Sequence, residues 1–207
     1  DKSNIQSRFI RGLRVTDQKI INIVESVLID FNNDIVDSLK KFGTDAVSIH
    51  TKKNNIIKVT PEAKELGFVG IPNKIDNNLI EKILNKKQVP IISPLGLGND
   101  NHPYNINGDT AAGAIAKSLR SRRLLLMTNV EGVLDKDKKL IDEISSSEIL
   151  KMIEDNIITE GMIPKINTCL DAVNNGVTAV GVIDGRKQHS ILFEIFSDKG
   201  SGTLIRK

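Results

Sequence analysis

RLLLMTNVEGV (123–133) and VTAVGVID (177–184) decide the fold, because each holds a short apolar run that is followed by polar residues. Apolar runs of this kind are typical of strands that are buried on both faces of a parallel sheet. The segments between them have helical patterns: SSSEILKMIEDN (145–156) begins with a serine that can cap a helix, and GMIPKINTCLDAVNNG (161–176) closes at a glycine. Strands that alternate with such helices predict an α/β fold with a mostly parallel sheet covered on both faces.

The N-terminal half continues this alternation. Residues 16–42 predict two helices, because apolar residues recur at helical spacing on both sides of a break at FNND (31–34), and residues 76–86 predict another. PLGLGNDNHPYN (94–105) is rich in turn residues and predicts a loop. We expect residues 1–207 to form a single domain, since no repeat or linker divides them. The strand-like pieces of this half are DAVSI (45–49), NIIKV (55–59), LGFVG (66–70) and VPIIS (89–93).

The composition argues against several classes of partner. Aromatic residues make up only 3% of the chain, too few for a surface that stacks on nucleic acid bases. The net charge of +3 comes from 29 basic and 26 acidic residues and singles out neither nucleic acid nor membrane. No apolar run approaches the ~18 residues that span a bilayer. The single Cys169 fits a reducing compartment, so we expect a cytoplasmic protein.

Several common enzyme motifs are absent from the sequence. It contains no G-x-x-x-x-G-K-[ST] loop, no G-x-G-x-x-G after a strand and no G-x-S-x-G elbow. His50, His102 and His189 lie far apart, without the paired spacing of metal ligands. The sequence therefore predicts no protein metal site and no covalent nucleophile.

Two groups of polar residues in the N-terminal half are candidates for binding. In GLRVTD (12–17), Arg14 precedes a helix, and its guanidinium could hold a carboxylate through two hydrogen bonds. In YNINGDTAAG (104–113), Asn105, Asn107 and Asp109 alternate along a predicted extended stretch, so they share one side as the chain enters a helix. An N-cap in which Asp109 accepts backbone N–H groups is the alternative interpretation.

Two further groups follow strands in the C-terminal half. TNVEGV (128–133) is a polar turn after a buried strand, where open α/β sheets bind their ligands. In IITEGMIPK (157–165), Gly161 precedes a helix and Lys165 lies one turn inside it. Backbone N–H groups and a mobile cation at such a place suit a phosphate group.

These segments together resemble the N-acetylglutamate kinases of the amino acid kinase family. GLRVTD, LGFVG, YNINGDTAAG, TNVEGV, ITEGMIPK and the ending IDGRKQHSILFEIFSDKGSGTLI follow that family's order and spacing, from about Ser7 to Ile205. The resemblance implies a three-layer αβα sandwich. It also implies transfer of a phosphoryl group from ATP with Mg²⁺ to the side-chain carboxylate of N-acetyl-L-glutamate, a step of arginine biosynthesis. A carboxylate attacks the γ-phosphorus in line, so the protein need supply only positioning and positive charge.

The resemblance also implies roles for individual residues. Arg14 and Asn105 should bind the substrate, Asp109 should orient catalytic lysines, and Lys165 should contact the transferring phosphoryl group. Mg²⁺ should be held mainly by the nucleotide phosphates. The expected ATP-binding residues are Asn129, Val130, Glu131, Gly132, Val133, Leu134, Ile157, Ile158 and Thr159.

The ending resembles that of the arginine-inhibited members, in which an arginine site accompanies a ring-shaped hexamer, so we expect a homo-oligomer (dimer or hexamer). Glu194 would accept the guanidinium of an arginine effector, and the backbone at Gly200 and Gly202 would approach its carboxylate. The alternative is that Leu192, Phe193, Ile195 and Phe196 dock the last helix on the core while Glu194 points to solvent.

Two other functions stay open. One is a related acylphosphate-forming kinase that acts on aminoadipate or aspartate, and the other is a non-catalytic arginine-binding regulatory subunit. The family's N-terminal strand with its catalytic lysine and Gly-rich turns does not occur in this sequence. We therefore expect a truncated chain that lacks N-terminal strands of the fold, and residues 1–207 to be inactive by themselves.

Overall fold

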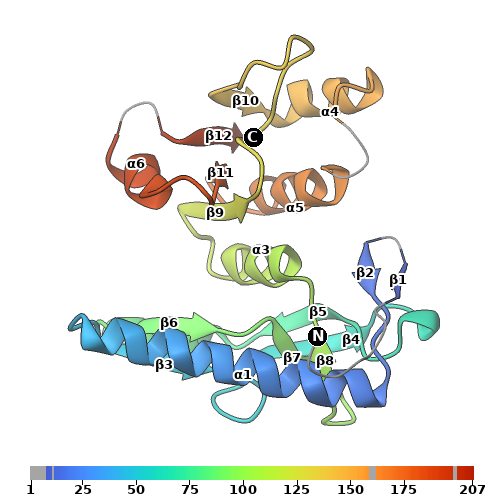
Figure 1. Ribbon diagram of the computed structural model, residues 1–207, viewed down its shortest axis with the longest axis vertical. Coiled ribbons are helices and arrows are strands. Elements are labelled where there is room, and N and C mark those ends of the chain that lie inside the picture. The colour runs from blue at the N-terminus through green and yellow to red at the C-terminus, as the bar shows by residue number, and fades with distance from the viewer. Residues whose placement is uncertain (1–7, 11, 159–161, 198–199) are drawn as a thin grey trace. The chain divides into compact units, whose positions relative to one another are not determined.

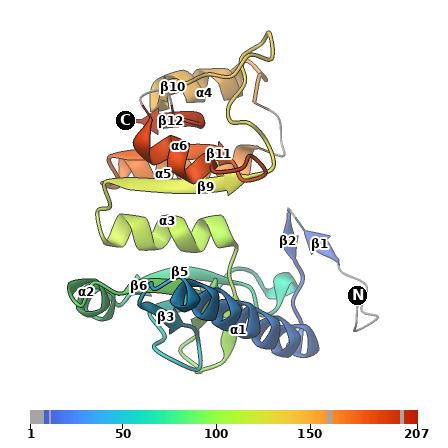
Figure 2. The ribbon, with the colours of Figure 1, turned by 60° about the vertical axis from the view of Figure 1, so that its left-hand side comes forward.

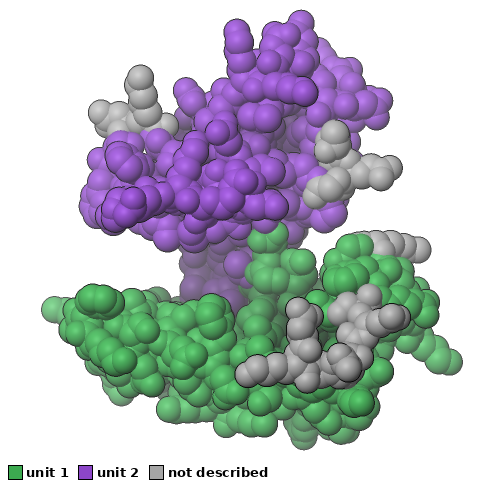
Figure 3. Space-filling model, viewed as in Figure 1, with its two compact units in different colours: residues 1–111 green, residues 112–207 purple. Residues whose placement is uncertain are grey.

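The computed structural model describes residues 8–10, 12–158, 162–197 and 200–207. The chain divides into two compact units, residues 1–111 and residues 112–207, which Figure 3 colours separately. Both units combine strands with helices, so the predicted α/β class is confirmed. No helix in the described part of the chain is long and apolar enough to cross a membrane.

Unit 1 contains one long helix and several small sheets. β3 and β6 form a parallel pair, β1 and β2 form an antiparallel hairpin, and the remaining strands form a sheet in the order β5-β4-β7-β8. In chain order its elements are β1 (Phe9–Ile10), β2 (Leu13–Arg14), α1 (Gln18–Lys41), β3 (Ala46–Ile49), β4 (Ile57–Pro61), the 3₁₀ helix η1 (Lys64–Leu66), β5 (Gly70–Ile75), α2 (Asn77–Asn85), β6 (Val89–Ile92), β7 (Leu95–Leu97), β8 (Pro103–Asn105) and the start of α3 (Gly108–Ser118).

The helix α1 is continuous, so the break predicted at residues 31–34 is wrong. Its N-cap is Asp17, whose carboxylate accepts the Ile20 N–H, as the sequence allowed. Asn32 is only 3% exposed, and its side chain hydrogen-bonds to the neighbouring strands β3 and β6. Its side chain donates to the Ile91 carbonyl in β6 (2.8 Å) and accepts from the Ser48 hydroxyl in β3 (2.6 Å). Figure 1 shows α1 alongside these two strands.

Two further predictions in unit 1 need correction. The stretch 94–105 is not only a loop, because it contains the short strands β7 and β8. LGFVG (66–70) is not a strand in itself: η1 ends at Leu66, and β5 begins only at Gly70. Between them, Gly67 and Val69 form single bridges to other segments.

Unit 2 is built on a four-stranded sheet in the order β10-β12-β11-β9. β9 and β11 are parallel, as are β10 and β12, whereas β11 and β12 are antiparallel. Its elements are the rest of α3, then β9 (Arg123–Thr128), β10 (Glu143–Ser145), α4 (Ser146–Glu154), α5 (Ile163–Asn174), β11 (Ala179–Asp184), α6 (Ser190–Phe196) and β12 (Gly202–Arg206). Ser145 caps α4, as its sequence predicted, and Glu148 completes a capping box with it.

Strand β11 is buried along its whole length. Val180 and Val182 belong to a core cluster that also contains Ile166, Cys169 and Leu170 of α5. Because alternate residues of a strand point to opposite faces, Gly181 lies on the other face, where Glu194 of α6 is its neighbour. Figure 2 shows both helices beside this sheet.

The Asn32 network generates a stability prediction. Asn32→Ala should lower the free energy of unfolding by about 2 kcal/mol, since the Ile91 carbonyl loses the Asn32 side-chain donor and the Ser48 hydroxyl keeps only Asn33 Oδ1 (3.1 Å) as an acceptor. Urea unfolding followed by circular dichroism measures this. Asn22→Ala on the exposed face of the same helix is the matched control. Equal stability of the two variants would contradict a role for Asn32 in joining α1 to β3 and β6.

Candidate active site

In unit 1, the backbone of Phe68 joins two of the polar segments. The Phe68 N–H donates to the Thr16 carbonyl (2.7 Å), and the Phe68 carbonyl accepts the Asn105 N–H (2.9 Å). The Thr16 N–H donates to the Leu66 carbonyl (2.9 Å). These three backbone hydrogen bonds, here called the clip, fix the segment after Arg14. GLRVTD and the end of β8 are therefore both fixed to the stretch 66–68, although far apart in sequence. The structure brings these two predicted substrate-binding segments together through their backbones.

Arg14 is half-buried in β2 and lies close to an aromatic ring. Its guanidinium carbon is 5.0 Å from the centre of the Phe9 ring, and Phe9 is its partner in the β1–β2 hairpin. A guanidinium over an aromatic face gains a cation–π interaction that also restricts its orientation. Such a restrained, half-buried cation is suited to binding a carboxylate ligand.

Asn105, Asn107 and Asp109, the polar residues around the start of α3, have different places in the structure. Asn105 is the last residue of β8, and Asn107 caps α3, because its Oδ1 accepts the Thr110 N–H (3.1 Å). The extended stretch therefore ends before Asp109, which lies in the first turn of the helix. Asn107 is thus the N-cap of α3, the role that the alternative interpretation of the sequence gave to Asp109. A carboxylate in the first turn is favoured by the helix dipole.

In unit 2, the expected ATP-binding turn follows β9 at the edge of the sheet. Its first three residues, Asn129, Val130 and Glu131, are exposed, whereas Gly132 and Val133 are buried. Gly132 has φ +149°, a conformation that side chains rarely allow. Leu134 then pairs with Leu140 and closes a short hairpin behind the turn. The turn therefore offers exposed backbone and side chains to a ligand while its second half is anchored in the core.

A second turn lies beside the first, and sequence reasoning missed it. Asp184 at the end of β11 pairs in register with Thr128, and the Gly185 N–H donates to the Thr128 carbonyl (2.8 Å). Arg186 donates from Nε (2.9 Å) and Nη2 (2.8 Å) to the Asp184 carboxylate, and this hydrogen-bonded guanidinium lowers the Asp184 pKa to about 2. The signal in the sequence was an Asp and an Arg two residues apart directly after a strand.

Lys187 connects the two turns. Its ammonium lies 3.7 Å from a carboxylate oxygen of Glu131. Both side chains are about half exposed, so this ion pair contributes little to stability. It nevertheless adds a basic residue, with Arg186, at the edge of the sheet where the expected ATP-binding turn lies.

The other predicted residues of unit 2 lie around the start of α5. Lys165 is half-buried in the first turn of this helix. Ile158 is 6% exposed and belongs to the core cluster, so its backbone is the part that could contact a ligand. Ile157 before it is half-buried. Thr159 and Gly161 lie outside the described residues.

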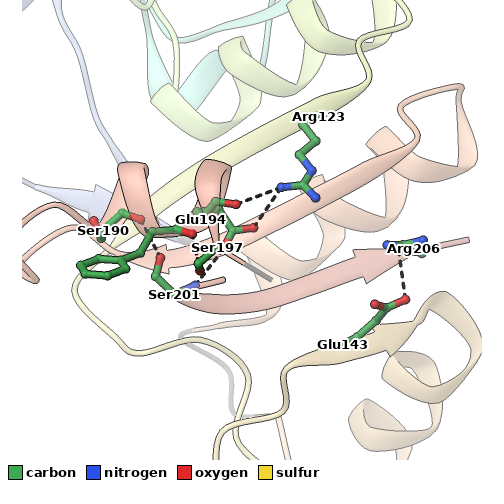
Figure 4. A network of polar contacts seen from close by, with 8 residues as sticks. Arg123, Glu143, Ser190, Glu194, Ser197, Ser201 and Arg206 are labelled. Atoms are coloured by element: carbon green, nitrogen blue, oxygen red, sulfur yellow. Dashed lines mark hydrogen bonds and ion pairs between the residues drawn. The ribbon is translucent and has the colours of Figure 1, made fainter. Parts of the chain in front are cut away.

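Glu194, the expected effector-binding residue, lines a cavity of about 200 Å³. Its carboxylate accepts the Ser201 N–H (2.9 Å) and lies 3.6 Å from Nη1 of Arg123 (Figure 4). Two further acids, Asp142 and Glu143, line the cavity. The remaining lining residues are Arg123, Ser197, Gly200, Gly202 and Leu204, so the cavity holds three acids and one arginine. Both predicted glycines thus lie with Glu194 around one acidic cavity.

The alternative for α6, in which its apolar residues dock on the core, is wrong. Glu194 is only 6% exposed, whereas Phe193 and Phe196 are 58% and 81% exposed. The reason is Arg123, which donates to the Glu194 carbonyl (3.1 Å) as well as lying near its carboxylate. The polar side of the helix therefore faces the sheet of unit 2.

His, Cys, Asp and Glu side chains form no group of three or more that could hold a metal ion in the described parts of the chain. The predicted site residues fall in both units: Arg14, Asn105 and Asp109 belong to unit 1, and Lys165 and the turn after β9 belong to unit 2.

Comparisons with known proteins give this arrangement a context. Residues 1–184 match the amino acid kinase family. An acetylglutamate kinase of Pelagibacter ubique (strain HTCC1062) is 55% identical over 204 residues, which are 99% of this chain and 71% of that protein. A second acetylglutamate kinase, from Clostridioides difficile (strain 630), is 46% identical and is covered over 74% of its length by the whole of this chain.

A solved structure from Streptococcus mutans UA159 has a similar fold. It superimposes with a TM-score of 0.83 at 29% sequence identity, and the match covers 99% of this chain and 79% of that one.

Proposed function

The chain belongs to the amino acid kinase family, and from this premise we propose that it phosphorylates the side-chain carboxylate of N-acetyl-L-glutamate with ATP. The observation that carries the proposal is the relative named acetylglutamate kinase, 55% identical over 99% of this chain. The product is an acyl phosphate, and the reaction belongs to arginine biosynthesis. We place the enzyme in the cytoplasm, because its single Cys169 fits a reducing compartment.

The proposed reaction needs orientation and positive charge more than it needs a nucleophilic side chain. A carboxylate oxygen of the substrate attacks the γ-phosphorus in line, and the bond to the ADP oxygen breaks. Arg14 and Asn105 hold the acetylated amino acid, and the turn 129–134 with residues 157–159 holds ATP. Lys165 stabilises the charge on the transferring phosphoryl group, and Asp109 orients ammonium groups around it. Mg²⁺, held mainly by the ATP phosphates, neutralises phosphate charge when it is bound.

We also propose that arginine regulates this enzyme through the Glu194 cavity. The support is a cavity of about 200 Å³ whose three acids, Asp142, Glu143 and Glu194, outnumber its one basic residue, Arg123. The guanidinium of Arg123 lies 3.6 Å from the Glu194 carboxylate, so this carboxylate is placed where it can pair with a guanidinium. Inhibition requires that arginine bind the less active state more tightly, so substrate affinity must fall as arginine binds. Exposed apolar side chains on α6, Phe193 and Phe196 among them, support the further proposal of a homo-oligomer.

Substitution of Lys165 tests the chemistry. Lys165→Ala in the full-length protein should lower kcat by ~10²-fold or more, because a positive charge in the transition state is lost. A coupled ADP-release assay with N-acetylglutamate, glutamate and aspartate as acceptors measures both activity and substrate choice. Lys151→Ala, on the exposed side of α4, is the matched control. An unchanged kcat in Lys165→Ala would remove this lysine from the mechanism.

Substitution of Arg14 or Asn105 tests substrate binding. Arg14→Ala and Asn105→Ala should each raise the KM for N-acetylglutamate by about tenfold or more and leave the KM for ATP nearly unchanged. Asn105→Ala keeps the backbone N–H that donates to Phe68, so the clip in unit 1 should survive. Arg122→Ala, an exposed arginine, is the control. Equal increases in both KM values would indicate that these residues are structural.

Titration with arginine tests the regulatory proposal. Millimolar arginine should inhibit the full-length enzyme, and Glu194→Ala should remove most of this inhibition because the guanidinium loses its buried carboxylate. Glu154→Ala, which is exposed and outside the cavity, should be inhibited like the wild type. A wild-type enzyme that is indifferent to arginine has no such site, and equal inhibition of wild type and Glu194→Ala would locate it elsewhere.

A further inference from the structure

Thr203, in β12, is a buried polar residue to which neither the sequence patterns nor the resemblance gave a role. It is 1% exposed. Its Oγ1 accepts the Val133 N–H (2.8 Å), and its hydroxyl lies 3.5 Å from the Val133 carbonyl, to which it donates. Val133 belongs to the turn that we propose to bind ATP, 70 residues earlier in the chain. A single side chain thus contacts both backbone groups of Val133, whose carbonyl also accepts the Ile141 N–H (2.9 Å).

Thr203 also lies close to Gly132, the residue before Val133 in the turn. A Cβ atom added to Gly132 would lie 2.6 Å from Thr203 Oγ1 and 3.1 Å from its backbone nitrogen. Val133 is 1% exposed, so no water is available to its N–H in place of the hydroxyl. Thr203 therefore restricts the backbone of the turn at both residues, by close packing at Gly132 and by a hydrogen bond at Val133.

The position of Thr203 is set by the sheet and does not depend on the turn. It pairs with Val182 in β11, and the next residue, Leu204, pairs with Glu143 in β10. Thr203 thus lies on a strand with hydrogen-bonded neighbours on both sides. A residue held in this way can transmit the geometry of the sheet to a loop that it contacts.

We propose that Thr203 is a positioning residue for the nucleotide, since its hydroxyl holds the second half of the turn 129–134 in the shape that binds ATP. The inference rests on the proposed function, in which this turn contacts ATP. Thr203 does not itself touch the reacting groups. Its effect should therefore appear in the affinity for nucleotide and not in the affinity for the acceptor.

Three variants separate the hydroxyl from the methyl group of Thr203. Thr203→Val keeps the shape and removes the hydroxyl, Thr203→Ser keeps the hydroxyl, and Thr203→Ala removes both. Thr203→Val should raise the KM for ATP by about tenfold, because the Val133 N–H loses its acceptor. The KM for N-acetylglutamate should stay within about twofold of wild type. Thr203→Ser keeps the hydroxyl, so its KM for ATP should also stay within about twofold of wild type. If Thr203→Val does not fold, Thr203→Ala against Thr203→Ser makes the same comparison.

Hydrogen exchange in the full-length protein distinguishes this proposal from the proposed function. Added MgADP should slow exchange at residues 129–134 in wild type, and slow it less in Thr203→Val at the same subsaturating concentration. If MgADP has no effect on these residues in wild type, the turn does not bind nucleotide, and both proposals fail. If wild type is protected and Thr203→Val is protected equally, or if both KM values rise together, only the role of Thr203 is overturned.

Discussion

The burial of β11 on both faces is the constraint on which the rest of unit 2 depends. All six of its residues are buried, so both sides of the strand need a cover. One side is covered by the apolar cluster with α5. On the other side, a Cβ atom at Gly181 would lie 2.8 Å from Leu125 Cδ2 and 3.2 Å from Glu194 Oε1, so glycine lets that carboxylate approach the strand without a shift of either side chain. The Glu194 cavity and the turns at the end of the sheet therefore both follow from this strand.

Strand β11 ends in a buried charged residue, Asp184, which is neutralised by a neighbour in the chain. Asp184 is 3% exposed, and Arg186 from the following turn supplies two hydrogen bonds to its carboxylate. Because its pKa is lowered to about 2, the stabilisation from this pair is fully present above the ordinary pKa of Asp. It is lost only as the pH falls toward 2. The turn beside the proposed ATP-binding residues is thus held by an ionised pair throughout the neutral range.

The sequence predicted what depends on local pattern and failed where distant partners decide. β9 begins at Arg123, where the predicted apolar run begins, and ends at Thr128, where the predicted polar turn begins, and the cap at Ser145 was visible, because apolar runs and caps are local signals. The break in α1 was wrong, since nothing near Asn32 shows that β3 and β6 use its side chain. The sequence left open the alternative in which Glu194 faces solvent for the same reason: Arg123 and Ser201 become its neighbours only in the fold. The clip at Phe68 consists of backbone atoms and leaves no signature in side chains.

The N-terminal end of β12 connects the two places where we propose that ligands bind unit 2. The Ser201 N–H donates to Glu194 Oε2, and two residues later the Thr203 hydroxyl holds Val133 in the turn after β9. A guanidinium that drew the Glu194 carboxylate away from Ser201 would therefore act on the same short segment that shapes the turn. Coupling between two sites requires an element whose geometry both ligands bias, and the effect must be reciprocal. If arginine at Glu194 weakens nucleotide binding through this segment, then nucleotide must weaken arginine binding by the same factor. Residues 201–203 form a short segment that is hydrogen-bonded to Glu194 at one end and to Val133 at the other, so it connects the two sites directly.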